Sequence, residues 1–456
     1  MFLGIKIHPS QPQSDEPNTV HVVTQRVQDH AENSTCDLSY SVAHGEIKMS
    51  CKQLWRGLSL AFVQGIFVMA FHGASDAASE PQGGLVFNCP ADNSPTLADA
   101  LKSYFQSLGV GEDIYSQTVD EGNGTLQFTL RDRSGGTDTL SLIHRLDYDL
   151  KEALIELPSS EKMPRTVVTV SQKEILLALL QHGRTTRFNG KSCNAQALKD
   201  VIGVRQNTVA WSESLKFMWP NGDYARWNSQ YWHHGNLKTH VSLHVAVSDV
   251  FMHPQKYSIG CYTATKLVII QGVLDYYRRI KHDVVTAQAI EARLMQDGEP
   301  LLNIEPGAAW YFEQSASLEG QASAGKLVFL EQDVAADNFV PGDWTYFLNT
   351  DPVTYQKTGY EGSNAIYLGR GKFDDYYNDN NHSYTYQEKL LEVYQWRHNV
   401  FSKERDVANI HPLTAAEIRA LGQTPENGGL QLNLRMTPYA FGFAELPPVQ
   451  MSLTRP

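Results

Sequence analysis

The order of apolar and polar positions along the chain predicts a mixture of helices and strands. Apolar residues spaced three and four apart are typical of an amphipathic helix, and alternate apolar residues are typical of a half-buried strand. Helices are predicted over residues 96–108, 175–182, 195–201, 205–211 and 386–397, and strands over residues 85–87, 125–131, 139–146 and 327–330. Ser171 and Glu174 have the spacing of a capping box in front of the second helix. This mixture predicts the α+β fold class.

The most informative stretch covers residues 254–277. Pro254 and Gly260 interrupt the backbone pattern, and an apolar segment with helical spacing follows. Cys261 therefore falls at or just before the first turn of a helix. Unpaired backbone N–H groups and the positive end of the helix dipole favour a thiolate there, which makes Cys261 a candidate nucleophile. The alternative is a small buried apolar residue that caps a core helix.

Length and pattern predict two domains, or three, in this chain of 456 residues. Residues 1–48 are polar and aperiodic, so no packed structure is expected there. A small α+β domain is predicted over residues 79–160, with a linker at 157–164. A second domain is predicted over residues 166–456, with a poorly patterned insertion at about 291–324.

Residues 49–78 have the order of parts found in a secretory signal peptide. Lys52 and Arg56 precede a mostly apolar run at 57–71, and small residues follow it. The run is too short for a comfortable transmembrane helix. This predicts an exported protein, secreted or periplasmic, in which Met49 is the initiator and the preceding residues are upstream sequence. The alternative is a buried or membrane-anchoring helix after a genuine N-terminal tail.

Cysteine spacing and net charge narrow the possible partners. The cysteines show neither a CxxC pair nor the Cys/His spacing of a zinc site, so no metal is expected. If the signal were cleaved near Ala77, Cys89 and Cys193 could pair in an oxidising compartment and leave Cys261 free. The net charge of −12 argues against nucleic acid as a partner, so the helix pair at 194–211 is predicted to be a packing motif.

Two later stretches complete an order of motifs that resembles a known superfamily. A turn and an aromatic-rich strand are predicted at 340–349, and a strand, Gly-rich turn and strand at 361–373. A helix-borne cysteine followed by these two motifs resembles the NlpC/P60 superfamily, the papain-like cysteine hydrolases of cell walls. The resemblance implies a papain-like core, in which the nucleophile helix packs on an antiparallel sheet.

Three motifs are similar, more specifically, to those of the bacterial spore-coat transglutaminases, which are protein-glutamine γ-glutamyltransferases. They are Cys261-x-Thr263-Ala264, Gly342-Asp343-x-x-Tyr346-Phe347-x-Asn349 and Gly362-x-Asn364-x-Ile366-x-Leu368-Gly369. The resemblance covers about residues 240–395. It implies that Cys261 attacks the carboxamide of a protein glutamine, releases ammonia and passes the acyl group to a lysine amine, without a cofactor. The implied partners are proteins with glutamine and lysine side chains.

The chain departs from that family at the residues that would assist the cysteine. Ser363 stands where the family carries its partner glutamate or histidine, and Gly260 where it carries an acidic residue. The later histidine is also absent near Asp375. Besides Ser363, the candidates for moving the proton are Glu361, Asp375 and His382.

Three alternatives to protein crosslinking remain open from the sequence. With water as the acceptor, the same enzyme is a glutamine deamidase. The export signal and the superfamily also favour a peptidoglycan amide hydrolase that acts on cell-wall peptide. The missing base leaves room for an inactive relative that only binds. In each case the membrane is involved only through the signal segment.

Overall fold

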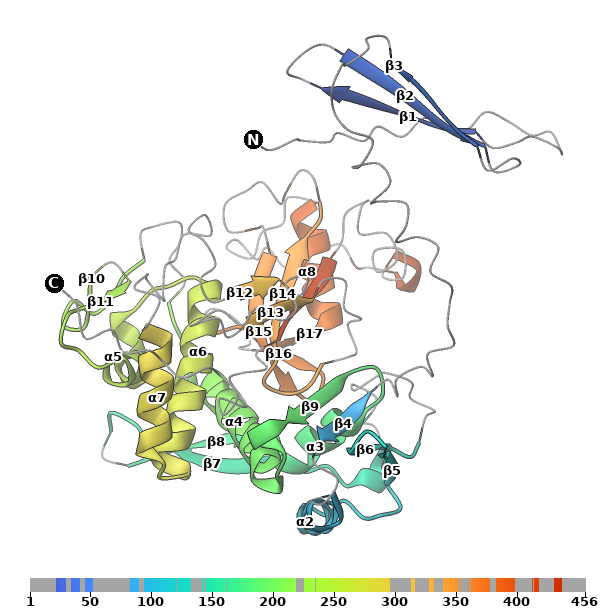
Figure 1. Ribbon diagram of the computed structural model, residues 1–456. Helices are drawn as coiled ribbons and strands as arrows, with labels where there is room; N and C mark the ends of the chain where they lie inside the picture. Colours follow the sequence, from blue (N-terminus) through green and yellow to red (C-terminus); the bar gives the residue numbers. More distant parts are fainter. Residues whose placement is uncertain are drawn as a thin grey trace, which may run out of the picture. The chain divides into compact units, whose positions relative to one another are not determined.

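The computed structural model describes residues 22–29, 34–41, 46–51, 83–89, 94–120, 122–132, 142, 145–161, 163–218, 225–233, 235–295, 313–315, 328–331, 339–351, 354, 360, 362–377, 383–397, 412, 414–417 and 430–436 (Figure 1). The chain forms two compact units, Met1–Glu80 and Pro81–Pro456.

The first unit contains a three-stranded antiparallel sheet. Its strands are β1 (Val22–Asp29), β2 (Ser34–Ser41) and β3 (Glu46–Cys51), in that order. Part of the segment predicted to lack packed structure therefore forms paired strands, and the β-branched residues of β1 favour a strand there. The predicted signal segment begins within β3, and beyond Cys51 it lies outside the described residues.

The second unit opens with a four-stranded sheet that is covered by a helix. The strand order is β5 (Tyr115–Asp120), β6 (Thr125–Leu130), β4 (Gly84–Asn88) and β9 (Thr185–Asn189). Helix α2 (Ser94–Ser107) contacts β6. These elements confirm the predicted helix at 96–108 and the predicted strands at 85–87 and 125–131. Only Leu142 and residues 145–146 of the predicted strand at 139–146 are described, and Leu146 begins a 3-10 helix (Leu146–Tyr148).

The predicted boundary between two domains near residue 160 is wrong. Strands β7 (Ala153–Leu157) and β8 (Arg165–Thr169) pair with each other, so residues 157–164 contain a hairpin connection and not a linker. Strand β9, from beyond the expected boundary, pairs with β4 in parallel. A disulfide between Cys89 and Cys193, whose Cα atoms are 5.7 Å apart, joins the same two regions and confirms the suggested pairing.

A group of helices follows. They are α3 (Gln172–Leu180), α4 (Ala195–Ser214), α5 (Leu243–Met252), α6 (Cys261–Asp275), a π-helix (Tyr276–Ile280) and α7 (Val284–Met295). Short elements between them are the 3-10 helices Gly190–Ser192 and Pro254–Lys256 and the strands β10 (Trp232–His233) and β11 (Asn236–Leu237). Ser171 caps α3 by accepting a hydrogen bond from Glu174 N at 3.2 Å, which confirms one half of the predicted capping box. The Glu174 side chain bonds the backbone N–H of Arg370.

Helix α4 is continuous, which corrects the prediction of two helices with a turn at Gly203. This glycine lies where the ring of Tyr276 presses on α4, and a Cβ atom there would come within 2.4 Å of that ring. Gly272 of α6 faces Thr208 of α4 in the same way, and a Cβ atom on Gly272 would lie 2.2 Å from Thr208 Oγ1. Both glycines thus allow α4 and α6 to lie close together, side by side in Figure 1.

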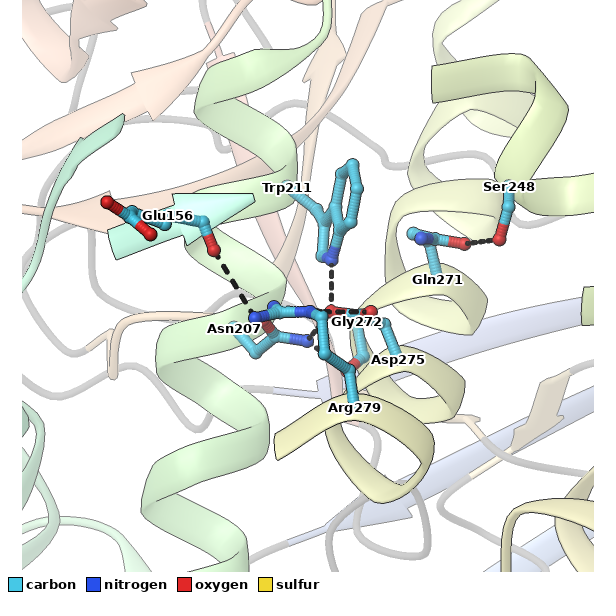
Figure 2. A network of polar contacts seen from close by, with 8 residues as sticks. All are labelled: Glu156, Asn207, Trp211, Ser248, Gln271, Gly272, Asp275 and Arg279. Atoms are coloured by element: carbon cyan, nitrogen blue, oxygen red, sulfur yellow. Dashed lines mark hydrogen bonds and ion pairs between the residues drawn. The ribbon is translucent and has the colours of Figure 1, made fainter. Parts of the chain in front are cut away.

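A buried polar network fixes the end of α6 on α4 (Figure 2). The carboxylate of Asp275 accepts hydrogen bonds from Trp211 Nε1 at 2.8 Å and Asn207 Nδ2 at 3.0 Å, and it pairs with Arg279 at 2.7 Å. Asn207 Nδ2 also donates to the carbonyl of Gly272 at 2.8 Å. This network therefore holds the C-terminal end of α6 against α4.

The second sheet of this unit lies against α4 and α6. Its strand order is β12 (Glu313–Ser315), β13 (Val328–Glu331), β18 (Leu430–Met436), β14 (Trp344–Asn349), β15 (Gly362–Gly369), β16 (Lys372–Asp374) and β17 (Ser383–Thr385). All its described pairs are antiparallel except β12 with β13. Helix α8 (Tyr386–Arg397) follows β17.

Most sequence predictions in this half of the chain are confirmed. They include the strand at 327–330, the strand within 340–349, the hairpin at 361–373 and the helix at 386–397. The predicted insertion at about 291–324 includes the end of α7 and β12, and its remaining residues lie outside the described part of the chain. The observed class is therefore mixed helix and sheet, with the cysteine-bearing helix packed on a mainly antiparallel sheet.

A buried charge cluster anchors the start of β14. Gly342 makes the preceding turn at a φ of 91°, and Asp343 behind it is 2% exposed. Asp343 pairs with Arg205 of α4 at 2.9 Å and also with Arg184. Burial by itself would raise the pKa of Asp343, but the two guanidinium groups more than reverse this effect and lower that pKa.

Candidate active site

Cys261 is the first residue of α6, as the sequence predicts. Gly260 is the N-cap, with an extended backbone (φ −70°, ψ 159°), and its carbonyl accepts the first helical hydrogen bond from Ala264 N at 3.0 Å. The approach to the helix is held by Tyr377, whose hydroxyl donates to the carbonyl of Ile259 at 3.0 Å. The Cys261 side chain is half-buried and is the free cysteine of the described residues.

Asn364 of β15 presents two N–H donors to the thiol. Its backbone N lies 3.4 Å from Cys261 Sγ and its Nδ2 lies 3.7 Å from the same atom. The Oδ1 of Asn364 accepts a hydrogen bond from the indole Nε1 of Trp344 at 2.9 Å. Since an indole N–H only donates, this bond assigns the amide oxygen to Trp344 and leaves the amide nitrogen facing the sulfur.

Trp344 is held in place by the surrounding packing. It is fully buried on β14, where it stands opposite Ile366 of β15. Its ring also lies 5.4 Å, between centroids, from that of Tyr262. The residue that follows the cysteine on α6 therefore contacts the tryptophan that orients Asn364, so α6, β14 and β15 build this part of the site together.

The protonation of Cys261 reflects two opposing influences. Burial raises the pKa of the Cys261 thiol above its ordinary value. The two N–H donors of Asn364 and the positive charge of Lys389 lower that pKa, but they do not fully offset the burial. The resting site thus holds a thiol whose ionisation depends on these neighbours.

A second group of side chains borders the thiol from β15, β17 and α8. Ser363 Oγ is hydrogen-bonded to the hydroxyl of Tyr384 at 3.4 Å. The Nζ of Lys389 lies 4.3 Å from the centroid of the Tyr384 ring, and Lys389 forms an ion pair with Glu392 one turn further along α8. Burial raises the pKa of Tyr384, which keeps its hydroxyl protonated.

The structure brings three of the five candidate residues into one neighbourhood. Ser363 precedes Asn364 on β15, next to Cys261. Asp375 is half-buried just after β16 and acts electrostatically on both Lys389 and Tyr384. Glu361 and His382 lie outside the described residues.

Asp375 stands beside a more deeply buried carboxyl group. Asp374 is fully buried, accepts a hydrogen bond from Ser212 Oγ, and accepts the backbone N–H of Asp375 at 2.7 Å. Burial raises the pKa of Asp374 well above its ordinary value. Asp374 therefore anchors the β16 end to α4, while Asp375 keeps partial exposure beside the site.

Four residues of the site were not among the predicted ones. Asn364 and Trp344 stand within or next to the quoted motifs, but their mutual hydrogen bond joins two strands and has no local signal. Tyr384 and Lys389 belong to a helix and strand that the sequence pattern alone does not connect to the cysteine. A lysine on a predicted helix is normally expected to be exposed to solvent. Only the packing of α8 shows that Lys389 is 5% exposed.

Comparison with known proteins identifies the family. The model of the protein-glutamine gamma-glutamyltransferase family matches residues 155–382, which is half of the chain and includes Cys261, Asn364 and Asp375. The chain belongs to this family. It is therefore a transglutaminase, a cysteine-dependent acyltransferase that acts on protein glutamine, and its family implies protein substrates with glutamine and lysine side chains.

One solved structure is similar to part of this transglutaminase. The chain shares 20% identity with a transglutaminase from Geobacillus stearothermophilus without its C-terminal extension, over 56% of this chain and 100% of that chain, with a TM-score of 0.34. No curated protein matches the chain.

Proposed function

We propose that this transglutaminase forms glutamyl-lysine isopeptide bonds through a thioester on Cys261. The observation that carries this proposal is the position of Cys261 Sγ, at the N-terminus of α6 and within 3.4 Å of the Asn364 backbone N. A helix N-terminus and two N–H donors stabilise a thiolate, which is the nucleophilic form of cysteine.

The reaction follows from that geometry in two steps. The thiolate attacks the γ-carboxamide carbon of glutamine, a C–S bond forms, and the C–N bond breaks once the nitrogen has taken a proton and leaves as ammonia. A lysine amine then attacks the thioester carbon, loses a proton and displaces Cys261. The first-turn N–H groups of α6, which have no partner within a helix, supply hydrogen bonds to the oxyanion in both steps.

A side chain must accept the thiol proton and deliver it to the departing ammonia. We propose that one of the candidates predicted from the sequence does so. Asp375 is half-buried beside Lys389 and Tyr384, and Ser363 connects Tyr384 to the strand that faces the thiol. A half-buried carboxylate beside Lys389 and Tyr384, which border the thiol, is suited to accept and return one proton. Glu361 and His382 remain candidates for the same role.

Substrate reaches the thiol from the side of Gly260. Among the described residues, and apart from the two chain neighbours of Gly260, no heavy atom lies within 4 Å of the position that a Cβ atom on Gly260 would take. The backbone there is extended and suits any residue, so the glycine serves to keep space open beside Cys261. That space supports the approach of a glutamine side chain to the sulfur.

We also place the catalytic core in the papain-like NlpC/P60 superfamily. The support is a nucleophile helix, α6, in contact with β15 of a mainly antiparallel sheet. With water as the acceptor, the same thioester gives glutamine deamidation. A peptidoglycan amide hydrolase is less favoured, because Ser363 stands where those hydrolases carry a histidine.

We propose further that the protein is exported. The Cys89–Cys193 disulfide supports this, since disulfides persist in oxidising compartments, and the apolar run at 57–71 supplies a signal segment. Within the part of the chain that the structure describes, no helix is long and apolar enough to cross a membrane. The intact mass of the exported protein tests the proposal. A mature chain that starts near residue 78 supports it, and one that retains residues 1–48 contradicts it.

Incorporation of a fluorescent primary amine into a glutamine-rich protein, with ammonia release measured in parallel, tests the chemistry. The wild type is expected to give both signals in equal amounts, and Cys261→Ser neither. Ammonia release without amine incorporation would identify a deamidase instead. Folding of the Cys261→Ser variant is checked by circular dichroism and by retention of the Cys89–Cys193 disulfide.

A further inference from the structure

The site holds a buried cation in addition to Ser363, the residue that stands where the family has a glutamate or a histidine to assist the cysteine. Lys389 of α8 is 5% exposed, and its Nζ lies over the ring of Tyr384 at 4.3 Å. A buried ammonium group is costly unless it is paired, and lysine is rarely placed in such a position without a role or a partner. The positive charge of Lys389 also acts on the Cys261 thiol.

A short chain of contacts connects Lys389 to the thiol. The Tyr384 ring that lies under the ammonium carries a hydroxyl that is hydrogen-bonded to Ser363 Oγ at 3.4 Å. Ser363 precedes Asn364, whose backbone N lies 3.4 Å from Cys261 Sγ. Lys389 also acts directly on Cys261, because its positive charge favours the thiolate and lowers the pKa of the thiol.

We propose that Lys389 is the positioning residue that supplies the positive charge for the Cys261 thiolate, in place of the partner that Ser363 has replaced. The inference rests on the proposed role of Cys261 as nucleophile. The ammonium stays on α8 and does not touch the substrate. It favours the thiolate by charge, through the buried ring of Tyr384.

The other titratable groups around the thiol fit this role. Tyr376 and Tyr384 are buried and uncharged at neutral pH, since burial raises the pKa of each, and burial also raises the pKa of Asp374 well above its ordinary value. Among the described residues, the carboxylates that act on Lys389 are Glu392 on α8 and Asp375 after β16.

Those two carboxylates keep the lysine charged. Burial by itself would lower the pKa of Lys389, but Glu392 and Asp375 more than reverse this and raise that pKa. The Glu392 side chain is 24% exposed, against 6% for that of Lys389, so the counter-charge lies nearer to solvent. The positive charge of Lys389 lowers the pKa of the Cys261 thiol.

The test is the pH dependence of alkylation of Cys261 by iodoacetamide in the full chain, read by mass spectrometry on the peptide that contains Cys261. Three variants are compared with the wild type. Lys389→Met removes the charge and keeps the apolar length, Lys389→Arg keeps the charge, and Glu392→Gln removes the counter-charge. Amine incorporation is measured on the same samples.

In Lys389→Met the apparent pKa of Cys261 is expected to rise by about one pH unit. At any pH well below the pKa, the fraction of Cys261 present as thiolate then falls about tenfold. Lys389→Arg is expected to keep the wild-type value within a few tenths, and Glu392→Gln to lower it or leave it unchanged. Amine incorporation at neutral pH falls with the thiolate fraction.

Two outcomes would overturn the proposal. One is an unchanged thiol pKa in Lys389→Met. The other is an equal rise in Lys389→Met and Glu392→Gln, which would mean that the ion pair holds α8 in place and that its charge is irrelevant to the thiol. Failure of the proposed function is seen separately, as amine incorporation that survives in Cys261→Ser.

Discussion

The indole N–H of Trp344 donates to Oδ1 of Asn364 at 2.9 Å and so turns the amide nitrogen of Asn364 toward the sulfur of Cys261. Trp344 thus acts on the Cys261 thiol through Asn364, without contacting the sulfur itself. The two strands that carry this pair are antiparallel neighbours, and their register places Trp344 opposite Ile366, two residues beyond Asn364. This relationship, together with the start of α6, defines the chemistry of the site.

Trp344→Phe removes the indole donor and keeps an aromatic ring against Tyr262. The Asn364 amide is then free to turn its oxygen toward the sulfur. We expect kcat/KM to fall about twofold to thirteenfold, the effect of one hydrogen bond of about 0.5–1.5 kcal/mol, with a higher apparent pKa for Cys261. The matched control is Trp211→Phe, which removes an indole bond to Asp275 far along α6. That variant should lose stability without any change in the thiol pKa, and equal pKa changes in both would contradict the argument.

Asn364→Asp places a carboxylate next to the thiol at almost unchanged volume. Repulsion between the two negative charges should raise the apparent pKa of Cys261 and lower amine incorporation at neutral pH at least tenfold. Asn364→Ala removes only the side-chain donor and leaves the backbone N–H in place, so its effect should be smaller. Alkylation rates across pH separate the two variants, and an Asp variant as reactive as the Ala variant would rule out this electrostatic role.

Gly260→Leu fills the open space beside Cys261. Its extended backbone accepts any residue, so stability should change by less than about 0.5 kcal/mol. KM for a protein glutamine substrate should rise, while iodoacetamide should still reach the thiol. Gly260→Ala, which adds little volume, is the control. If Gly260→Leu keeps the wild-type KM, substrate does not approach from this side.

Asp343→Asn breaks the buried cluster that anchors β14, and it leaves two arginines without their shared carboxylate. Such a change costs about 3–5 kcal/mol in the free energy of unfolding, measured by urea titration at pH 7. Because the folded state lowers the pKa of Asp343, the stabilisation is complete above the unfolded pKa of about 3.9 and is lost as the pH falls through the folded value. The gap between wild type and variant should therefore shrink in acid.

A control for Asp343→Asn is Asp149→Asn, which removes an exposed pair with Lys151 at 2.9 Å. Exposed pairs contribute little, so this variant should unfold at nearly the same urea concentration as the wild type at pH 7. Equal losses in the two variants would show that burial of the Asp343 cluster does not contribute as argued.

The sequence predicts those parts of the fold that depend on local rules. Pro254 and Gly260 before a helical apolar pattern mark the start of α6, and the Gly-rich turn between β15 and β16 marks that hairpin. The predictions of a domain boundary near residue 160 and of a helix break at Gly203 are wrong for a common reason. In each case a partner distant in the sequence decides the outcome: β4 for β9, and Tyr276 for Gly203.

The same limit applies to the site. Cys261 has a local signal, since a helix start is visible in the sequence. The bond between Trp344 and Asn364 and the burial of Lys389 depend on strand pairing and on the packing of α8, which no spacing along the chain encodes.

The most direct test of the account is amine incorporation into a glutamine-rich protein by the wild type and by Cys261→Ser. The account predicts incorporation with matching ammonia release for the wild type, and neither for a folded Cys261→Ser variant. Incorporation that persists in Cys261→Ser would show that the thiol at the start of α6 is not the nucleophile.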